Sequence, residues 1–202
     1  MKKTIFMAAL GMSVLAFNTA QAADFAPYVG LKTGISHVVN KAHSLPEQDD
    51  NLWFGSIALG ADFREMDVNS NLLLELEYTY RPSFSEHSTA GTDVSSQSQS
   101  LMLNGYYVIP ARMEVKPYIS AGLGFSRNDR DVRYLTNGGA RFSKKADSLT
   151  WSLGAGALIP EVMDYTDIIV GYRYLDMGSM KTGWNNVDFR AHEFYAGINY
   201  KF

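Results

Sequence analysis

Nine charged side chains stand at positions where a strand would turn them away from its apolar face. If that side faces a narrow interior, opposite charges should pair, because an unpaired buried charge is costly. Arg173 and Glu193 are expected at similar heights on adjacent strands, as a cross-strand pair. The pattern favours a plug of salt bridges, with a gated ion path as the alternative. The nine are Lys32, Asp62, Glu75, Glu77, Arg81, Lys116, Arg173, Glu193 and Lys201.

Histidines are the other candidates for chemistry, as metal ligands or general bases, and the chain has four. His37, His43 and His87 fall at or in polar connections without the spacing of a ligand set, so no metal site is expected. His192 lies on an apolar face and is interpreted as an interfacial side chain. No serine shares that face within its segment, as a lipid A-modifying enzyme would require. We therefore expect neither catalysis nor a cofactor.

The segments that must position these side chains alternate apolar and polar residues with a period of two. In the clearest segment, Leu72, Leu74 and Leu76 oppose Glu75 and Glu77, and a helical period fits less well. An even number of such strands predicts an all-β fold, an eight-stranded antiparallel up-and-down transmembrane β-barrel. The eight segments are 28–36, 52–63, 71–81, 97–108, 115–127, 148–159, 168–174 and 191–202.

The connections between these strands alternate between long and short. The long, polar ones are 37–51, 82–96, 128–147 and 176–188; the short ones are 64–70, 109–114 and 160–166. Short periplasmic turns and longer external loops are typical of bacterial outer-membrane barrels. Both termini are therefore expected in the periplasm.

This arrangement gathers the aromatic residues of the apolar faces at two heights, as the two interfaces of a membrane require. A soluble ligand barrel with its apolar face inward is the competing fold, and it explains neither group. The outer group is Trp53, Tyr78, Tyr80, Phe125, Trp151, Tyr172 and Tyr174, and the periplasmic group is Phe63, Tyr107, Tyr200 and Phe202.

The first 22 residues have the features of a secretory signal peptide. Lys2 and Lys3 precede an apolar stretch too short to span a bilayer, and Ala20-Gln21-Ala22 is an A-x-A cleavage site. We expect residues 1–22 to be removed and residues 23–202 to form one barrel domain in the cell outer membrane. Removing two lysines leaves 16 basic against 21 acidic side chains, a net charge of −5. This balance argues against nucleic acid as a partner.

The connection 128–147 is the most distinctive of the long ones. Asn137-Gly138 between alternating segments is a strong hairpin signal and predicts a two-stranded extension. Five basic residues against three acidic ones predict contact with lipopolysaccharide phosphates or an acidic partner, with a solvated charged loop as the alternative. The basic residues are Arg130, Arg133, Arg141, Lys144 and Lys145.

The last strand has an apolar face that ends in aromatic residues, Tyr200 and Phe202. Such an end is typical of a barrel whose last strand closes against the first and seats an aromatic ring at the membrane interface. We expect the barrel-assembly machinery to need these two residues. Outer-membrane lipid and lipopolysaccharide are the other expected partners.

Five segments, in this order, resemble the opacity-type family of small outer-membrane β-barrel proteins. They are YVGLKTGIS (28–36), YISAGLGFS (118–126), LTWSLGAGALI (149–159), VGYRYLDMG (170–178) and YAGINYKF (195–202). The resemblance implies a Gram-negative surface protein, often an antigen or adhesin, with four external loops exposed to a host or cell-surface ligand. It carries over no binding residues, because the loops are the parts that vary. A narrow, low-conductance porin-like channel is the alternative function.

Overall fold

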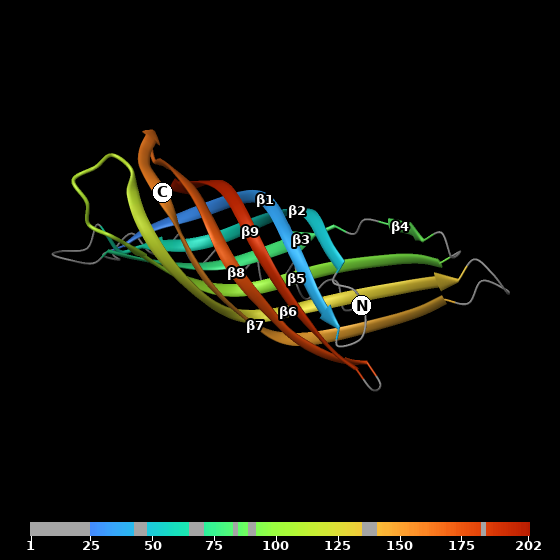
Figure 1. Cartoon of the computed structure of the whole chain (residues 1–202). Helices are drawn as coiled ribbons and strands as arrows, with labels where there is room; N and C mark the ends of the chain where they lie inside the picture. Colours follow the sequence, from blue (N-terminus) through green and yellow to red (C-terminus); the bar gives the residue numbers. More distant parts are fainter. Residues whose placement is uncertain are drawn as a thin grey trace.

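A computed structural model describes residues 25–42, 48–64, 71–82, 85–88, 92–134, 141–182 and 185–202, and these form nine strands in one sheet (Figure 1). The strands are β1 (Ala26–Ala42), β2 (Gln48–Asp62), β3 (Leu72–Arg81), β4 (Ser85–Ser88), β5 (Thr92–Val108), β6 (Lys116–Tyr134), β7 (Arg141–Met163), β8 (Thr166–Thr182) and β9 (Asn185–Lys201). The expected signal peptide and the Asn137-Gly138 turn lie outside the described residues. In the described part of the chain, no helix has the length and apolar character needed to cross a membrane.

The sheet closes on itself through eight of these strands. Neighbours run antiparallel in the order β3-β2-β1-β9-β8-β7-β6-β5, and β3 pairs with β5 to complete the ring. The first and last strands meet from Tyr28↔Lys201 to Ala42↔Val187. The short β4 pairs only with the outer part of β5 and lies outside the ring. The predicted eight-stranded antiparallel up-and-down barrel is confirmed.

The barrel wall is apolar outside and charged inside. In β3, Leu74 and Leu76 are exposed, whereas Glu75 and Glu77 are each 1 % exposed. On β6, Phe125 is 67 % exposed on the outer surface. A soluble barrel would bury its apolar face, because removing apolar surface from water drives its folding. An apolar outer band suits a hydrocarbon surrounding, so the competing soluble fold is excluded.

Side chains fill the bore in layers, as the small diameter of an eight-stranded barrel allows. The start of β1 and the end of β9 lie together at one end of the barrel, which we call the turn end, and polar side chains from its turns close the bore there. Next come a layer of apolar and tyrosine side chains, a layer of paired charges, and a second apolar layer. The first apolar layer is Tyr28, Leu73, Tyr106, Val108, Tyr118, Leu158, Ile169 and Tyr195, with Phe54 above them, and the second is Val38, Met102, Leu175, Met177 and Ala191.

The strands run further than the apolar alternation predicts. β6 and β7 stay paired as far as Arg133↔Arg141, and β1 and β2 as far as Asn40↔Gln48. Most of the expected long connections are therefore strand, and the prediction of long loops was wrong. The reason is that a hairpin satisfies its backbone groups with its own partner strand and needs no apolar face outside the membrane. The two-stranded extension predicted within 128–147 is confirmed for the backbone.

The short connection 160–166 is also mostly strand. β7 continues to Met163 and β8 begins at Thr166, leaving a two-residue turn whose Tyr165 has a φ of 62°. Glu161, with a φ of 53°, marks an irregularity in the register just before the turn. Its amide donates to Asp167 Oδ1 at 3.0 Å, which fixes the turn against β8.

Beyond the ring, the wall separates into two sheets. β7 pairs with β8 only up to Trp151↔Asp176, and β2 with β3 only up to Gly55↔Tyr80. A bulge with Gly178 at a φ of 77° bends β8 at this level. Strands β4 to β7 form the sheet that extends to the right of Figure 1, which we call the projecting sheet. The other sheet is made by the outer parts of β8, β9, β1 and β2.

Candidate functional site

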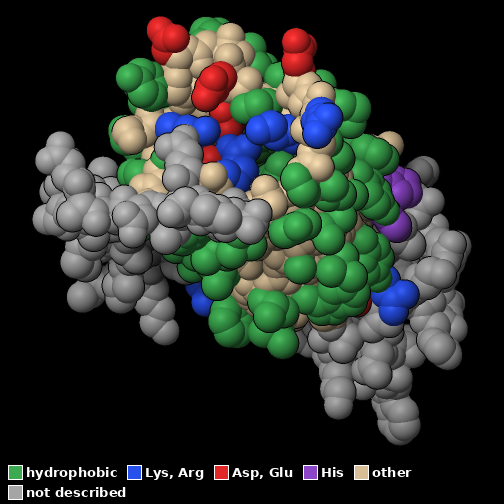
Figure 2. Space-filling model, turned by 90° about the vertical axis from the view of Figure 1, so that its left-hand side faces the viewer, with side chains coloured by type: hydrophobic (Ala, Val, Ile, Leu, Met, Phe, Trp, Pro, Cys, Tyr) green, Lys and Arg blue, Asp and Glu red, His purple; other side chains and the backbone are tan. Residues whose placement is uncertain are grey.

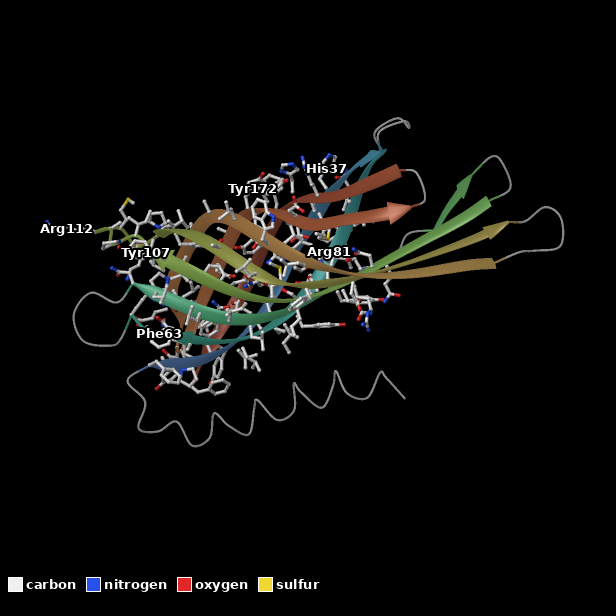
Figure 3. All side chains as sticks on the ribbon, turned by 90° about the horizontal axis from the view of Figure 1, so that it is seen from below. His37, Phe63, Arg81, Tyr107, Arg112 and Tyr172 are labelled. Carbon is white, nitrogen blue, oxygen red and sulfur yellow. The ribbon has the colours of Figure 1, made fainter. Side chains whose placement is uncertain are left out.

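Six side chains inside the bore form one network, which we call the charged core. They are Lys32, Glu75, Glu77, Arg81, Arg173 and Glu193, each at most 4 % exposed. Arg173 lies at its centre, where Nε donates to Glu193 Oε2 at 2.6 Å and Nη1 donates to Glu77 Oε2 at 2.8 Å. From the opposite wall, Arg81 (labelled in Figure 3) donates from Nε to Glu193 Oε1 at 2.9 Å. The predicted cross-strand pair of Arg173 and Glu193 is present.

Lys32 connects the remaining carboxylates of the charged core. Its ammonium pairs with Glu75, and Nζ lies 3.7 Å from Glu77 Oε2. The Tyr28 hydroxyl donates to Glu75 Oε2 at 3.1 Å, and Asn104 Nδ2 donates to Glu77 Oε2 at 2.8 Å. Three cations thus face three carboxylates, and neutral donors satisfy further carboxylate oxygens, which is the condition under which buried charges are tolerated.

Aromatic rings pack against the cations of the charged core. The Phe54 ring centroid lies 5.7 Å from the guanidinium carbons of both Arg81 and Arg173, and Tyr195 lies 5.5 Å from that of Arg173. Lys32 Nζ lies 5.1 Å from the Tyr106 ring. These distances are those of cation–π contacts. Held by ion pairs and rings together, the charged core has the chemistry of a rigid plug.

The tyrosines below the charged core fit against glycines. The hydroxyls of Tyr118 and Tyr195 are 2.8 Å apart, and the Tyr118 hydroxyl also donates to the Val170 carbonyl at 3.1 Å. A Cβ atom at Gly156 or Gly171 would overlap the Tyr118 hydroxyl. The alternation places these tyrosines inside, but it does not predict their pairing with particular glycines, which depends on the register of three strands.

A second network closes the turn end, and we call it the clasp: Asp62, Arg64, Asp167 and Lys201. Arg64 donates from Nε to Asp62 Oδ1 at 2.8 Å and from Nη2 to Asp167 Oδ2 at 2.9 Å. Lys201 Nζ lies 3.3 Å from both carboxylates. Burial lowers the pKa of Arg64, but the hydrogen bonds and charges of the two aspartates outweigh this and raise the pKa above its ordinary value. The clasp joins the β2–β3 connection, β8 and β9.

The remaining predicted residues lie apart from both networks. Lys116 is only half-buried, near the turn end, and forms no ion pair within the described residues. Of the five basic residues in 128–147, the backbone is described: Arg130 lies opposite Lys144, and Arg133 opposite Arg141, in the projecting sheet. His43 and His87 belong to stretches whose side chains the structure does not describe.

The C-terminal residues close the ring at the turn end. The Phe202 amide donates to the Pro27 carbonyl at 3.1 Å, which ties the end of β9 to the start of β1. The Phe202 ring packs edge-on against Tyr200 with centroids 5.5 Å apart, and both rings are exposed on the outer wall.

Deleting Phe202 is expected to lower the yield of heat-modifiable barrel in the outer membrane, because it removes the last closing bond between β9 and β1 and its interfacial ring. Gel mobility of unheated membrane fractions measures this yield. Phe63→Ala, which removes a ring at the same end but leaves the C-terminal strand intact, is the control and should assemble normally. An unchanged yield after the deletion would contradict the assembly role.

His192 belongs to an outward aromatic group on the wall. Its Nδ1 lies 2.6 Å from the Tyr172 hydroxyl, and its ring packs edge-on against Tyr174 at 5.5 Å. Tyr172 also packs against Phe194, with centroids 5.0 Å apart. Figure 3 shows Phe63 and Tyr107 near the turn end and Tyr172 further along the barrel, so outward aromatics stand at two heights as predicted. These contacts place His192 among aromatic rings on the outer wall, and its interfacial role stays a prediction.

Known proteins share this architecture over nearly the full chain. Residues 4–202 match the family model described as the outer membrane protein beta-barrel domain. The outer membrane protein PagN of Salmonella typhimurium is 25 % identical over 244 residues, covering 99 % of this chain and 100 % of PagN.

Solved barrels show the same fold at lower identity. Neisserial surface protein A is 22 % identical with a TM-score of 0.60, over 87 % of this chain and 97 % of that protein. Ail, the attachment invasion locus protein of Yersinia pestis, solved in complex with the heparin analogue sucrose octasulfate, is 14 % identical with a TM-score of 0.56, over 87 % of this chain and 99 % of Ail. With its closed antiparallel barrel and its apolar outer wall, this chain belongs to the family of outer-membrane β-barrel proteins.

Proposed function

We propose that this protein is a surface protein of the adhesin type, in which the filled barrel is a scaffold and the projecting sheet is the interaction surface. The observation that carries the proposal is the length of β5, β6 and β7, which stay paired well beyond the level where β3 and β8 separate from them. Strands of this length exceed what a membrane span needs. The extra length therefore supports a role outside the membrane.

The orientation in this proposal puts the turn end in the periplasm and the projecting sheet outside the cell. Short turns and both described termini lie at one end, and the long paired hairpins lie at the other, which is the pattern of outer-membrane barrels. In this orientation Tyr200 and Phe202 meet the barrel-assembly machinery from the periplasm. The hairpins contact lipopolysaccharide and are exposed to a host or cell-surface ligand.

We propose an anionic polymer as the ligand class of the projecting sheet. The pairs Arg130↔Lys144 and Arg133↔Arg141 place four basic residues in facing positions of the β6–β7 hairpin. The structure of Ail with a heparin analogue gives a polyanion bound to a barrel of this fold. The alternative is that the basic residues protect the outer part of β7, which pairs only with β6 in the described residues, from pairing with other edges.

Neutralising the hairpin tests this proposal. With Arg130, Arg133, Arg141, Lys144 and Lys145 all changed to Gln, binding of the refolded protein to immobilised heparin and to lipopolysaccharide should weaken at least about 100-fold, since each cation near an anionic surface contributes about 1 kcal/mol. The control is Arg127→Gln with Arg190→Gln, which removes two partly exposed cations that are not among these five. Unchanged binding, or self-association of the neutralised variant without loss of binding, would contradict the ligand assignment.

The proposal includes no catalytic step and no open channel. Nδ1 of His192 contacts the Tyr172 hydroxyl, an aromatic neighbour rather than a nucleophile. The layers of paired charges and packed rings across the bore favour a plug over the narrow channel that is the alternative function.

A further inference from the structure

A hollow lies at the turn end, beside the β5–β6 connection, with Arg64 and Asn71 also in its lining. Its volume is about 430 Å³, and among the described residues that line it the titratable side chains are Arg64, Arg112 and Lys116, all basic. Figure 2 looks onto this end and shows Lys and Arg side chains gathered beside Asp and Glu side chains, with hydrophobic side chains around them. The hollow belongs neither to the charged core nor to the projecting sheet, so the function proposed above gives it no role.

Two of the three cations are available to a ligand. Arg64 belongs to the clasp, where two aspartates balance Arg64 and Lys201. Within the described residues, Arg112 and Lys116 form no ion pair, and both side chains line the hollow. Glu114, in the β5–β6 connection, is exposed and does not line the hollow.

The outer wall beside the hollow is apolar. Tyr107 and Ile109 are exposed at the end of β5, and Met113 and Val115 are exposed in the connection to β6. Ile109 lines the hollow itself, so the cations and the lipid-facing surface adjoin. A soluble anion would use only the cations, whereas a lipid would use the cations and the apolar wall together.

We propose that this hollow binds the phosphate headgroup of an anionic phospholipid of the periplasmic leaflet, with its acyl chains along the apolar wall. The proposal rests on the orientation proposed above. Arg112 and Lys116 supply the charge, and Arg64, whose charge its aspartates balance, forms a fixed part of the wall. A zwitterionic headgroup should bind less well, because its ammonium group would meet Arg112 and Lys116.

The test uses the refolded full chain in mild detergent, titrated with phosphatidylglycerol, with phosphatidylethanolamine of the same acyl chains, or with glycerol phosphate. Native mass spectrometry counts the retained lipid. Phosphatidylglycerol should bind best, and Arg112→Gln with Lys116→Gln should weaken its binding about 10- to 30-fold, at about 1 kcal/mol per cation. Arg127→Gln, which removes an exposed cation further along β6, is the control and should bind as the wild type does.

Three outcomes would overturn the proposal: equal binding of both lipids, binding of phosphatidylglycerol that survives the double substitution, or glycerol phosphate binding as tightly as the lipid, which would mean a free-phosphate site.

The orientation of the barrel in the membrane is tested separately. Because the chain has no cysteine, Met113→Cys gives a single label site, which an impermeant maleimide should reach only in permeabilised cells. Labelling of intact cells would refute the orientation, while loss of lipid binding alone leaves the projecting sheet proposal standing.

Discussion

Replacing Arg173 by methionine is expected to lower the free energy of unfolding of the refolded barrel by about 3–5 kcal/mol, the usual cost of breaking a buried ion pair. Arg173 pairs with both Glu77 and Glu193, and its removal leaves the two glutamates with different remaining cations. Glu193 keeps Arg81 at 2.7 Å, whereas Glu77 retains only Lys32 as a cation, at 3.7 Å. Urea unfolding followed by tryptophan fluorescence measures the change.

Two variants separate lost pairing from lost packing at Arg173. Adding Glu77→Gln to Arg173→Met restores the neutrality of the charged core and should recover a large part of the lost stability. Arg127→Met removes an arginine whose partner Asp147 is exposed, and exposed pairs contribute about 0–1 kcal/mol. If Arg173→Met cost no more than Arg127→Met, the charged core would not be a structural plug.

Changing Gly156 to alanine is expected to destabilise the barrel by about 1–3 kcal/mol, as overpacking does. The added methyl group would overlap both the Val170 carbonyl oxygen, which belongs to the paired strand β8, and the Tyr118 hydroxyl, which donates to that carbonyl. The backbone cannot yield without loosening the β7–β8 pairing, so the hydrogen bond is expected to be lost as well. The same unfolding measurement reports this change.

Gly55 is the matched control for Gly156, because a Cβ atom there would meet no atom within 4 Å. Gly55→Ala should leave stability within about 0.5 kcal/mol of the wild type, as substitutions away from packed features do. Equal effects at the two positions would show that alanine is generally harmful in these strands. In that case the fit between Tyr118 and Gly156 would not be specific.

Much of the barrel follows from the sequence because each strand has two chemically different faces. In residues 71–81, three leucines alternate with Glu75 and Glu77, and a wall with lipid on one side and a filled bore on the other has only one way to satisfy that pattern. The same parity places Lys32, Arg173 and Glu193 inside. Their pairing follows once an eight-stranded ring sets the distances.

Two features could not be read from the alternation. Arg64 and Asp167 fall in or beside short connections, where no period marks a side chain as inward, and they meet across 103 positions of sequence. The sequence of the projecting sheet lacks the apolar alternation of the barrel wall, so its strands resemble polar loops. Only backbone pairing, as at Arg133↔Arg141, identifies them as strands.

The central claim is that the charged core seals the bore, so that the barrel is a scaffold and ligands bind at the projecting sheet. Conductance of the refolded protein in a planar lipid bilayer tests this claim most directly. A bilayer that contains wild-type barrels, with insertion verified by protease protection, is expected to stay silent at all moderate voltages. Silence would leave the scaffold interpretation intact. Steady, ion-selective steps from the wild type would contradict it, because they would make the bore a channel and the charged core its filter.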